Sequence, residues 1–109
     1  MQNPPPEKIA ELADVFRLMG DGSRLRVLML VRDQARPVGD IATATGLSPS
    51  LVSHHLRLLR AGRLVRAERR GKQVFYALDD AHVRCVLSDM VDHVAEDADQ
   101  AAPTVRAAS

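Results

Sequence analysis

The stretch that decides the fold is SPSLVSHHLRLLRAGRLVRAERRGKQVFYAL, residues 48–78. It opens on Ser48 and Pro49, which together favour the start of a helix. The serine hydroxyl can accept a hydrogen bond from an unpaired amide, and proline fits the first turn, where its missing N–H is not needed. The apolar spacing that follows predicts a helix that continues to Arg60 and ends near Gly62.

Two extended segments follow this helix, over residues 64–69 and 73–78. Arg70, Gly71 and Lys72 lie between them and are expected to form the tip of a β-hairpin. A helix that is followed directly by a two-stranded hairpin is the second half of a winged helix-turn-helix.

The sequence upstream of this stretch supplies the remaining helices of such a fold. The predicted helices are one over about 7–19, a second that begins after a cap at Asp21 or Ser23, and a short third over about 38–45. Gly46 is the expected left-handed C-cap of the third helix, and residues 33–37 are expected to form a turn. A last helix is predicted from Asp79 or Asp80 to about Glu96. The predicted fold class is therefore mainly α with a small β-hairpin, a winged helix-turn-helix.

The chain of 109 residues is long enough for one domain. We expect a flexible leader over residues 1–6, a winged-helix DNA-binding and dimerisation domain over 7–97, and a disordered tail over 98–109. Aromatic residues make up only 3% of the chain, so the core must be aliphatic. No apolar run approaches the roughly 20 residues of a membrane span, and the start lacks the pattern of a signal peptide. These features predict a cytoplasmic protein with no membrane partner.

Charges are segregated along the chain although the formal net charge is only +1. Residues 54–72 contain seven basic side chains and the single acid Glu68, whereas residues 79–99 contain seven acidic side chains and the single base Arg84. A basic block inside a near-neutral chain is a candidate surface for a polyanion. Two solvated charged faces are the alternative interpretation.

The helix that begins at Pro49 has two different faces. At about 100° per residue, one stripe is polar: Ser50, Ser53, His54 and Arg57. The opposite stripe is apolar and should face the core: Val52, Leu56 and Leu59. The hydroxyls, imidazole and guanidinium of the polar stripe suit base edges and phosphates in a major groove. An ordinary amphipathic surface helix would show the same two faces.

The hairpin tip favours the DNA-binding interpretation. Arg69, Arg70 and Lys72 place several cations where they could reach flanking phosphates, although charged tips also serve solubility. The predicted DNA-binding residues are Ser48, Ser50, Ser53, His54, Arg57, Arg69, Arg70 and Lys72.

From about residue 7 to residue 96, the chain resembles the ArsR/SmtB family of metal-responsive winged-helix transcriptional repressors. The resemblance is most specific in VSHHLRLLR, residues 52–60, and in the wing pattern R-x-G-K…Y from Arg69 to Tyr76. It implies that Ser50, Ser53 and His54 meet the major groove. It also implies a homodimer, joined through the first and last helices, on an operator with inverted half-sites.

The last helix carries a spaced set of possible metal ligands, Asp80, His82, His93 and Glu96. The two histidines are eleven residues apart, which is roughly 16 Å along a helix. One helix cannot bring both to a single ion, because Zn–N bonds are about 2 Å. Two antiparallel copies crossing near residue 88 would align Asp80 and His82 of one subunit with His93 and Glu96 of the other and form two identical sites. Taken singly, each residue could instead be a helix cap or a surface side chain.

These four ligands match the metal site of the zinc-sensing branch of the resembled family. A closed set of N and O donors suits Zn²⁺, with Co²⁺ second and Ni²⁺ disfavoured. Residues 40–45 contain no cysteine, so arsenic, cadmium or lead sensing through thiolates is not expected there. In the family, a hydrogen bond from a ligand histidine to the end of the recognition helix carries the signal, which here implies a link from His93 to the backbone near Arg63. An apolar stripe beside the ligands is expected to seal the dimer seam: Val83, Val86, Leu87, Met90 and Val94.

The sequence thus predicts a homodimeric repressor that binds operator DNA without metal and is released by Zn²⁺ or Co²⁺. The single cysteine, Cys85, excludes an internal disulfide and a Cys-rich zinc finger. We expect it to be a buried, inert thiol. The alternative function is a winged-helix regulator that responds to thiol oxidation at Cys85. An enzyme is not expected, because four protein ligands leave zinc no open position for water, and a cytosolic metal buffer is a further alternative.

Overall fold

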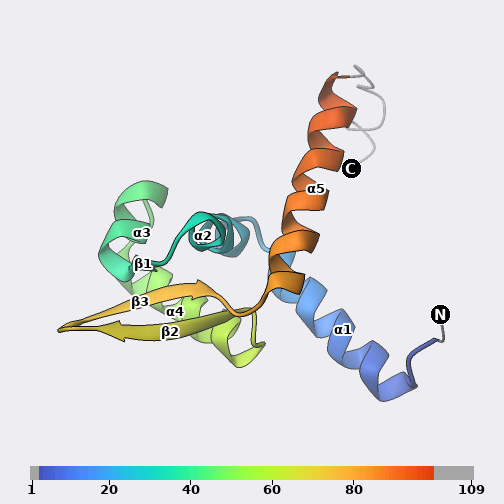
Figure 1. Ribbon diagram of the computed structural model, residues 1–109, viewed down its shortest axis with the longest axis horizontal. Helices are drawn as coiled ribbons and strands as arrows, with labels where there is room; N and C mark the ends of the chain where they lie inside the picture. The colour runs from blue at the N-terminus through green and yellow to red at the C-terminus, as the bar shows by residue number, and fades with distance from the viewer. Residues whose placement is uncertain (1–2, 100–109) are drawn as a thin grey trace.

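The structure is a computed structural model, and it describes residues 3–99. The elements follow one another as α1 (Pro6–Met19), α2 (Gly22–Asp33), β1 (Arg36–Pro37), α3 (Val38–Thr45), α4 (Pro49–Ala61), β2 (Val65–Arg70), β3 (Gln73–Leu78) and α5 (Ala81–Asp99) (Figure 1). Each predicted helix is present, and the predicted mainly helical winged helix-turn-helix is confirmed.

Short capping motifs set the boundaries of the helices in the DNA-binding half. The carboxylate of Asp21 accepts a hydrogen bond from the Arg24 amide at 2.9 Å and so begins α2. Gly46 ends α3 in the left-handed region at φ 76°, where a side chain would be strained. Both features agree with the prediction from sequence, and they leave only a short turn between α3 and α4.

The sheet has three antiparallel strands in the order β1-β3-β2, one strand more than predicted. The expected turn over residues 33–37 is wrong in its second half, because Arg36 pairs with Tyr76 and Pro37 with Phe75. Arg36 is also fixed from α2, since its Nε atom donates to the Leu30 carbonyl at 3.2 Å. Two residues are too few to show the alternating pattern of a strand, which is why the sequence hid this one.

The hairpin is tighter than expected. β2 runs one residue further than predicted, so that Arg70 pairs with Gln73 and the turn consists of Gly71 and Lys72 alone. Gly71 has a φ of 63°, which is the positive φ that a two-residue hairpin turn requires. Arg70 therefore lies at the end of a strand and not in the tip itself.

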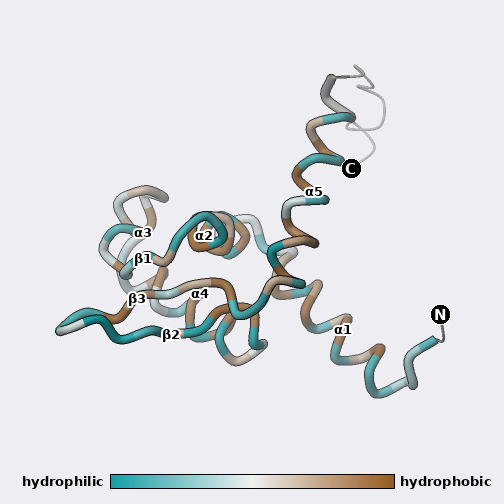
Figure 2. The backbone as a smooth tube through the Cα atoms, in the orientation of Figure 1, coloured by the Kyte–Doolittle hydropathy of each residue, from teal (hydrophilic) through white to brown (hydrophobic). Residues whose placement is uncertain are grey.

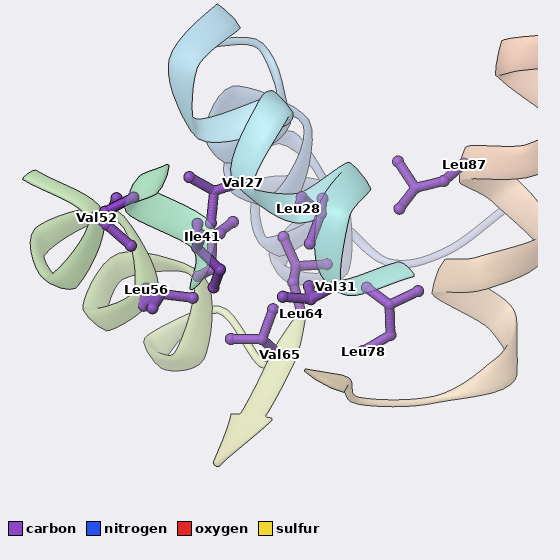
Figure 3. Close-up of a cluster of buried hydrophobic side chains, with 12 residues drawn as sticks. Val27, Leu28, Val31, Ile41, Val52, Leu56, Leu64, Val65, Leu78 and Leu87 are labelled. Atoms are coloured by element: carbon purple, nitrogen blue, oxygen red, sulfur yellow. The ribbon is translucent and has the colours of Figure 1, made fainter. Parts of the chain in front are cut away.

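The core is aliphatic and lies between α2, α3, α4 and the sheet (Figure 3). The fully buried side chains with the largest volumes are Leu28, Ile41, Leu56, Leu59, Val27, Val31, Val52 and Val65. The predicted apolar face of α4 is thus buried. Leu87 of α5 also packs into this core at 5% exposure, so its expected place in a seam between subunits is wrong.

α1 and α5 extend away from this body (Figure 1), and hydrophobic residues recur along both helices (Figure 2). No residue of α1 is buried. Phe16 on α1 is 57% exposed and Met90 on α5 is 53% exposed. The other large apolar side chains left exposed on these two helices are Ile9, Leu12, Val86, Val91 and Val94.

The ends of the chain differ slightly from the predicted divisions. Pro6 already belongs to α1, and α5 continues through Ala98 and Asp99. Residues 1–2 of the predicted leader and residues 100–109 of the predicted tail lie outside the described residues. Within residues 3–99, none of the helices combines the length and the apolar character needed to cross a membrane.

Candidate DNA interface and metal ligands

The start of α4 is fixed by Ser48. Its hydroxyl accepts a hydrogen bond from the Leu51 amide at 3.1 Å, and Pro49 follows in the first turn. The hydroxyl oxygen that was predicted to meet DNA is therefore also the N-cap of the helix.

The end of α4 is fixed by Gly62. A Cβ atom at position 62 would lie 2.4 Å from the Cδ1 atom of Leu18, so any larger residue there would require the Leu18 side chain to shift. Ser48 thus fixes where α4 begins, and Gly62 leaves room for Leu18 of α1 at its other end.

The outward face of α4 presents the predicted polar stripe. Ser50, His54 and Arg57 are exposed, and Ser53 is half-buried. The guanidinium of Arg57 has no hydrogen bond or ion pair to any residue from 3 to 99. These four side chains therefore lie on a surface that can be reached by another molecule, which is the placement that the DNA prediction requires.

His55 is a functional candidate that the sequence reading missed. It is 5% exposed, and its Nε2 atom lies 2.8 Å from the Oγ atom of Ser23, which in turn donates to the Asp21 carboxylate at 2.9 Å. Burial lowers the pKa of His55 below its usual value. Its Nδ1 atom is buried and has no partner among the described residues. Helical spacing could have found it, because position 55 follows Val52 by three residues on the core side.

The wing contains an ionic cluster around Glu68. Its carboxylate bonds to Arg66 at 2.8 Å and to Arg70 at 2.9 Å. Hydrogen bonds from Arg70 and Arg66 lower the pKa of Glu68. The guanidinium of Arg70 also lies 4.6 Å from the centre of the Phe75 ring. Arg70 is thus held on the strand surface, whereas Arg69 and Lys72 are exposed and have no side-chain partner within residues 3–99.

The first two predicted metal ligands lie together at the start of α5. The Oδ1 atom of Asp80 accepts from the Val83 amide at 3.0 Å, which makes Asp80 a helix cap. The same oxygen is 3.9 Å from the Nδ1 atom of His82, whose side chain is 98% exposed. His82 also borders an apolar recess of about 150 Å³ between α1 and α5, which Leu12 and Phe16 help to line.

The other two predicted ligands, His93 and Glu96, are exposed residues near the far end of α5. Among residues 3–99, no three histidine, cysteine or acidic side chains gather closely enough to hold a metal ion. A single chain therefore keeps the four candidates apart in two pairs, as the spacing along one helix requires.

Cys85 is exposed on α5, so the expectation of a buried thiol is wrong for the single chain. The reason is its angular position on the helix. Leu87 faces the core, and a residue two positions earlier lies on nearly the opposite side at about 100° per residue.

Comparison with known proteins agrees with this geometry. A family profile described as "Bacterial regulatory protein, arsR family" matches residues 21–67, from α2 into β2. The transcriptional regulator CmtR of Mycobacterium tuberculosis is 41% identical over 99 residues, which cover 90% of this chain and 84% of CmtR. A protein of Synechocystis named transcriptional repressor SmtB homolog is 39% identical over 90 residues, which cover 83% of this chain and 68% of that protein.

A solved structure extends the likeness to three dimensions. It is the homodimeric winged helix-turn-helix DNA-binding domain of Mb0332 from Mycobacterium bovis, described as a possible ArsR-family regulator. It is 32% identical with a TM-score of 0.75, and the match covers 89% of this chain and 92% of that one. From sequence and fold together, this chain belongs to the ArsR family of winged-helix transcriptional regulators.

Proposed function

We propose that this protein is a homodimeric, metal-sensing repressor that binds operator DNA in its metal-free form and is released by Zn²⁺ or Co²⁺. The observation that carries the proposal is on α5, which has metal-ligand residues at both ends and exposed apolar side chains between them. A helix of this kind is suited to pair with a second copy of itself and to complete metal sites in doing so.

The proposed dimer buries the apolar surface of α1 and α5. Leu12 and Phe16 on one helix and Val86 and Met90 on the other are each near half-exposed in the single chain. Exposed apolar side chains that lie together favour association, because burial removes them from water. A second copy is the occupant that fits best, since the related Mb0332 domain is a homodimer.

The proposed metal sites lie at the two ends of this seam. If two α5 helices cross antiparallel near residue 88, Asp80 and His82 of one subunit face His93 and Glu96 of the other. Two imidazoles and two carboxylates are a donor set that fits Zn²⁺, which would supply a fixed tetrahedral link between the subunits. The Oδ1 atom of Asp80 lies 3.9 Å from the Nδ1 atom of His82 within the chain, which supports their use as a pair.

The coupling to DNA follows from thermodynamic linkage. Metal bound at the two sites favours one crossing of the two α5 helices, and with it one spacing of the two α4 helices. DNA favours a different spacing, so the binding of metal opposes the binding of DNA. We place the link at His93 and the backbone near Arg63, at the end of α4. A two-fold dimer reads two half-sites, so the operator should have inverted repeats.

The same residues disfavour the other functions considered. A zinc enzyme needs an open coordination position, which a four-ligand site does not have. Regulation by thiol oxidation would depend on Cys85 alone, whose symmetry mate in the proposed crossing is about 9 Å away, too far for an unstrained disulfide. A repressor of this kind would act in the cytoplasm, where its DNA lies.

A DNA-release titration tests the proposal. Zn²⁺, Co²⁺ and Ni²⁺ are added separately to the protein bound to its own promoter DNA, and binding is followed by fluorescence anisotropy. We expect Zn²⁺ and Co²⁺ to release the DNA at about one ion per subunit. Asp89→Asn, which changes an α5 acid outside the ligand set, should respond like the wild type, and Cys85→Ser should do the same.

Two outcomes would contradict the proposal. If no metal changes DNA binding, the protein is not a metal sensor. If His93→Ala abolishes DNA binding in the absence of metal, His93 serves the fold and not the switch.

A further inference from the structure

A polar recess lies beside the recognition helix α4, on the side of strand β3. It has a volume of about 520 Å³ and is lined by Ser53, Leu56, Arg57, Arg60, Ala61 and Tyr76. Five of these residues belong to α4, and Tyr76 belongs to β3. The recess is therefore formed where the flank of α4 meets the strand that leads back from the wing tip.

The chemistry of the recess suits an anion. Two guanidiniums and two hydroxyls supply hydrogen-bond donors, and no carboxylate lines it. Arginine presents its donors as a planar fork that matches the oxygens of a phosphate. Leu56 and Ala61 provide an apolar wall, which strengthens such contacts by excluding water from one side.

The two arginines of the recess are also unpaired. Most arginines of residues 3–99 donate to a carbonyl or a carboxylate from their guanidinium: Arg17, Arg24, Arg26, Arg32, Arg36, Arg66, Arg70 and Arg84. Neither Arg57 nor Arg60 has such an acceptor within the described part of the chain. Their donors are thus available to a ligand that the protein itself does not supply.

The position of the recess indicates the source of the anion. Ser53 and Arg57 belong both to the recess and to the polar stripe of α4 that is proposed to enter the major groove. Tyr76 lies on β3, the strand that begins at Gln73, directly after Lys72 of the wing tip. A DNA strand that runs from the recognition helix to the wing would pass this recess.

We propose that this recess holds a phosphate of the DNA backbone, bound by Arg57 and Arg60 with the hydroxyls of Ser53 and Tyr76 as further donors. The inference rests on the proposed DNA binding and adds Arg60 and Tyr76 to the interface. A phosphate contact carries no sequence information, so the recess sets the register and affinity of the complex and not its sequence preference.

The test compares Arg60→Gln with the matched control Arg32→Gln. Both variants lose one positive charge, but Arg32 lies at the end of α2 and is paired with Asp33 at 3.1 Å. Binding of the metal-free full-length protein is measured from low to high salt, on promoter DNA and on an unrelated duplex, with folding checked by thermal unfolding.

We expect Arg60→Gln to reduce the slope of log K against log salt by about 0.9 per recess, the value for one phosphate of B-DNA. The affinity at 0.1 M salt should fall on the order of tenfold per recess, and equally on both duplexes. Arg32→Gln should keep the wild-type slope. Equal slopes for Arg60→Gln and wild type would overturn the inference, as would a loss confined to promoter DNA or an equal loss in both variants.

A second arm separates the DNA backbone from a free phosphate as the occupant. Inorganic phosphate is added to the DNA-free protein while the Arg60 Nε resonance is followed by NMR. We expect no saturable shift, since the duplex supplies the phosphate; a saturable shift would assign the recess to a free phosphate ligand and overturn the inference. If the wild type binds no DNA at all, the proposed function fails, which is distinct from failure at the recess.

Discussion

The Nε2 atom of His55 lies 2.8 Å from the Oγ atom of Ser23, and this contact joins the recognition helix to the first turn of α2. Ser23 also donates to Asp21, the cap of α2, so the cap, the hydroxyl and the imidazole form one chain of contacts. The packing of α4 against α2 therefore includes a polar contact of a buried histidine.

This contact predicts a dependence of stability on pH. Burial lowers the pKa of His55 in the folded state, whereas in the unfolded chain it titrates near its ordinary value of about 6.5. The unfolded state therefore takes up the proton first, and the free energy of unfolding should fall as the pH is lowered below about 6.5. Urea unfolding at pH 7.5 and pH 5.5 measures the change.

Two variants assign the effect to this residue. His55→Leu replaces the buried imidazole with an apolar side chain and should lose the part of the pH dependence that His55 contributes. His54→Gln changes the exposed neighbour and should retain the wild-type dependence. If His55→Leu shows the same pH dependence as the wild type, the buried imidazole does not couple folding to protonation.

The junction between α1 and α4 predicts a sensitivity at Gly62. Gly62→Ala places a Cβ atom 2.4 Å from the Leu18 side chain, so we expect a loss of about 1–3 kcal/mol in the free energy of unfolding. Gly39→Ala is the matched control, because a Cβ there meets nothing within 4 Å. It should be neutral or stabilising by up to ~1 kcal/mol, since alanine is the better helix former. Equal unfolding midpoints for the two variants would show that Leu18 simply moves aside.

The Glu68 cluster predicts that the negative charge of Glu68 lowers the affinity of the wing for DNA. Glu68→Gln removes a negative charge from beside two basic residues, Arg66 and Arg70. We expect binding to an unrelated duplex to tighten by about two- to fivefold at low salt, because the effect of a surface charge is largely screened by solvent. Glu7→Gln, at the start of α1, should leave binding unchanged. Weaker binding by Glu68→Gln would instead mean that the carboxylate orders Arg70 for contact with DNA.

The sequence was informative where local chemistry decides the structure. Ser48 and Gly46 mark helix ends by rules that act within a few residues, and both were predicted correctly. The buried face of α4 followed from periodicity in the same way. β1 could not be predicted, because a two-residue strand exists only through its pairing with β3. The exposure of Cys85 depends on which face of α5 packs on the body, and Leu87 decides that face through tertiary contacts.

The candidate sites also differ in whether residues close in the sequence are enough to form them. The polar stripe of α4 lies within one helix, and the chain alone places it on the surface. The predicted metal ligands fall into two pairs near opposite ends of α5, and within residues 3–99 no three such side chains gather at one place. The proposed sites therefore depend on a second subunit. The recess at Arg60 was missed because Tyr76 reaches it from a different element, sixteen positions along the chain.

The proposed arrangement of the metal sites makes one more prediction, which only an intersubunit site can satisfy. Each site takes His82 from one subunit and His93 from the other. In a His82→Ala homodimer or a His93→Ala homodimer, each of the two sites lacks one histidine, and both variants should lose the visible absorption of tetrahedral Co²⁺.

Mixing the two variants should restore part of that absorption. In the mixed dimer, one site loses both histidines, but the other combines an intact His82 from the His93→Ala subunit with an intact His93 from the His82→Ala subunit. We expect Co²⁺ absorption to return after subunit exchange, at up to one site per mixed dimer. The control is His82→Ala alone, taken through the same exchange treatment. Absorption that stays absent after exchange, while the mixed dimer is shown to form, would mean that His82 and His93 do not share an ion across the subunit seam.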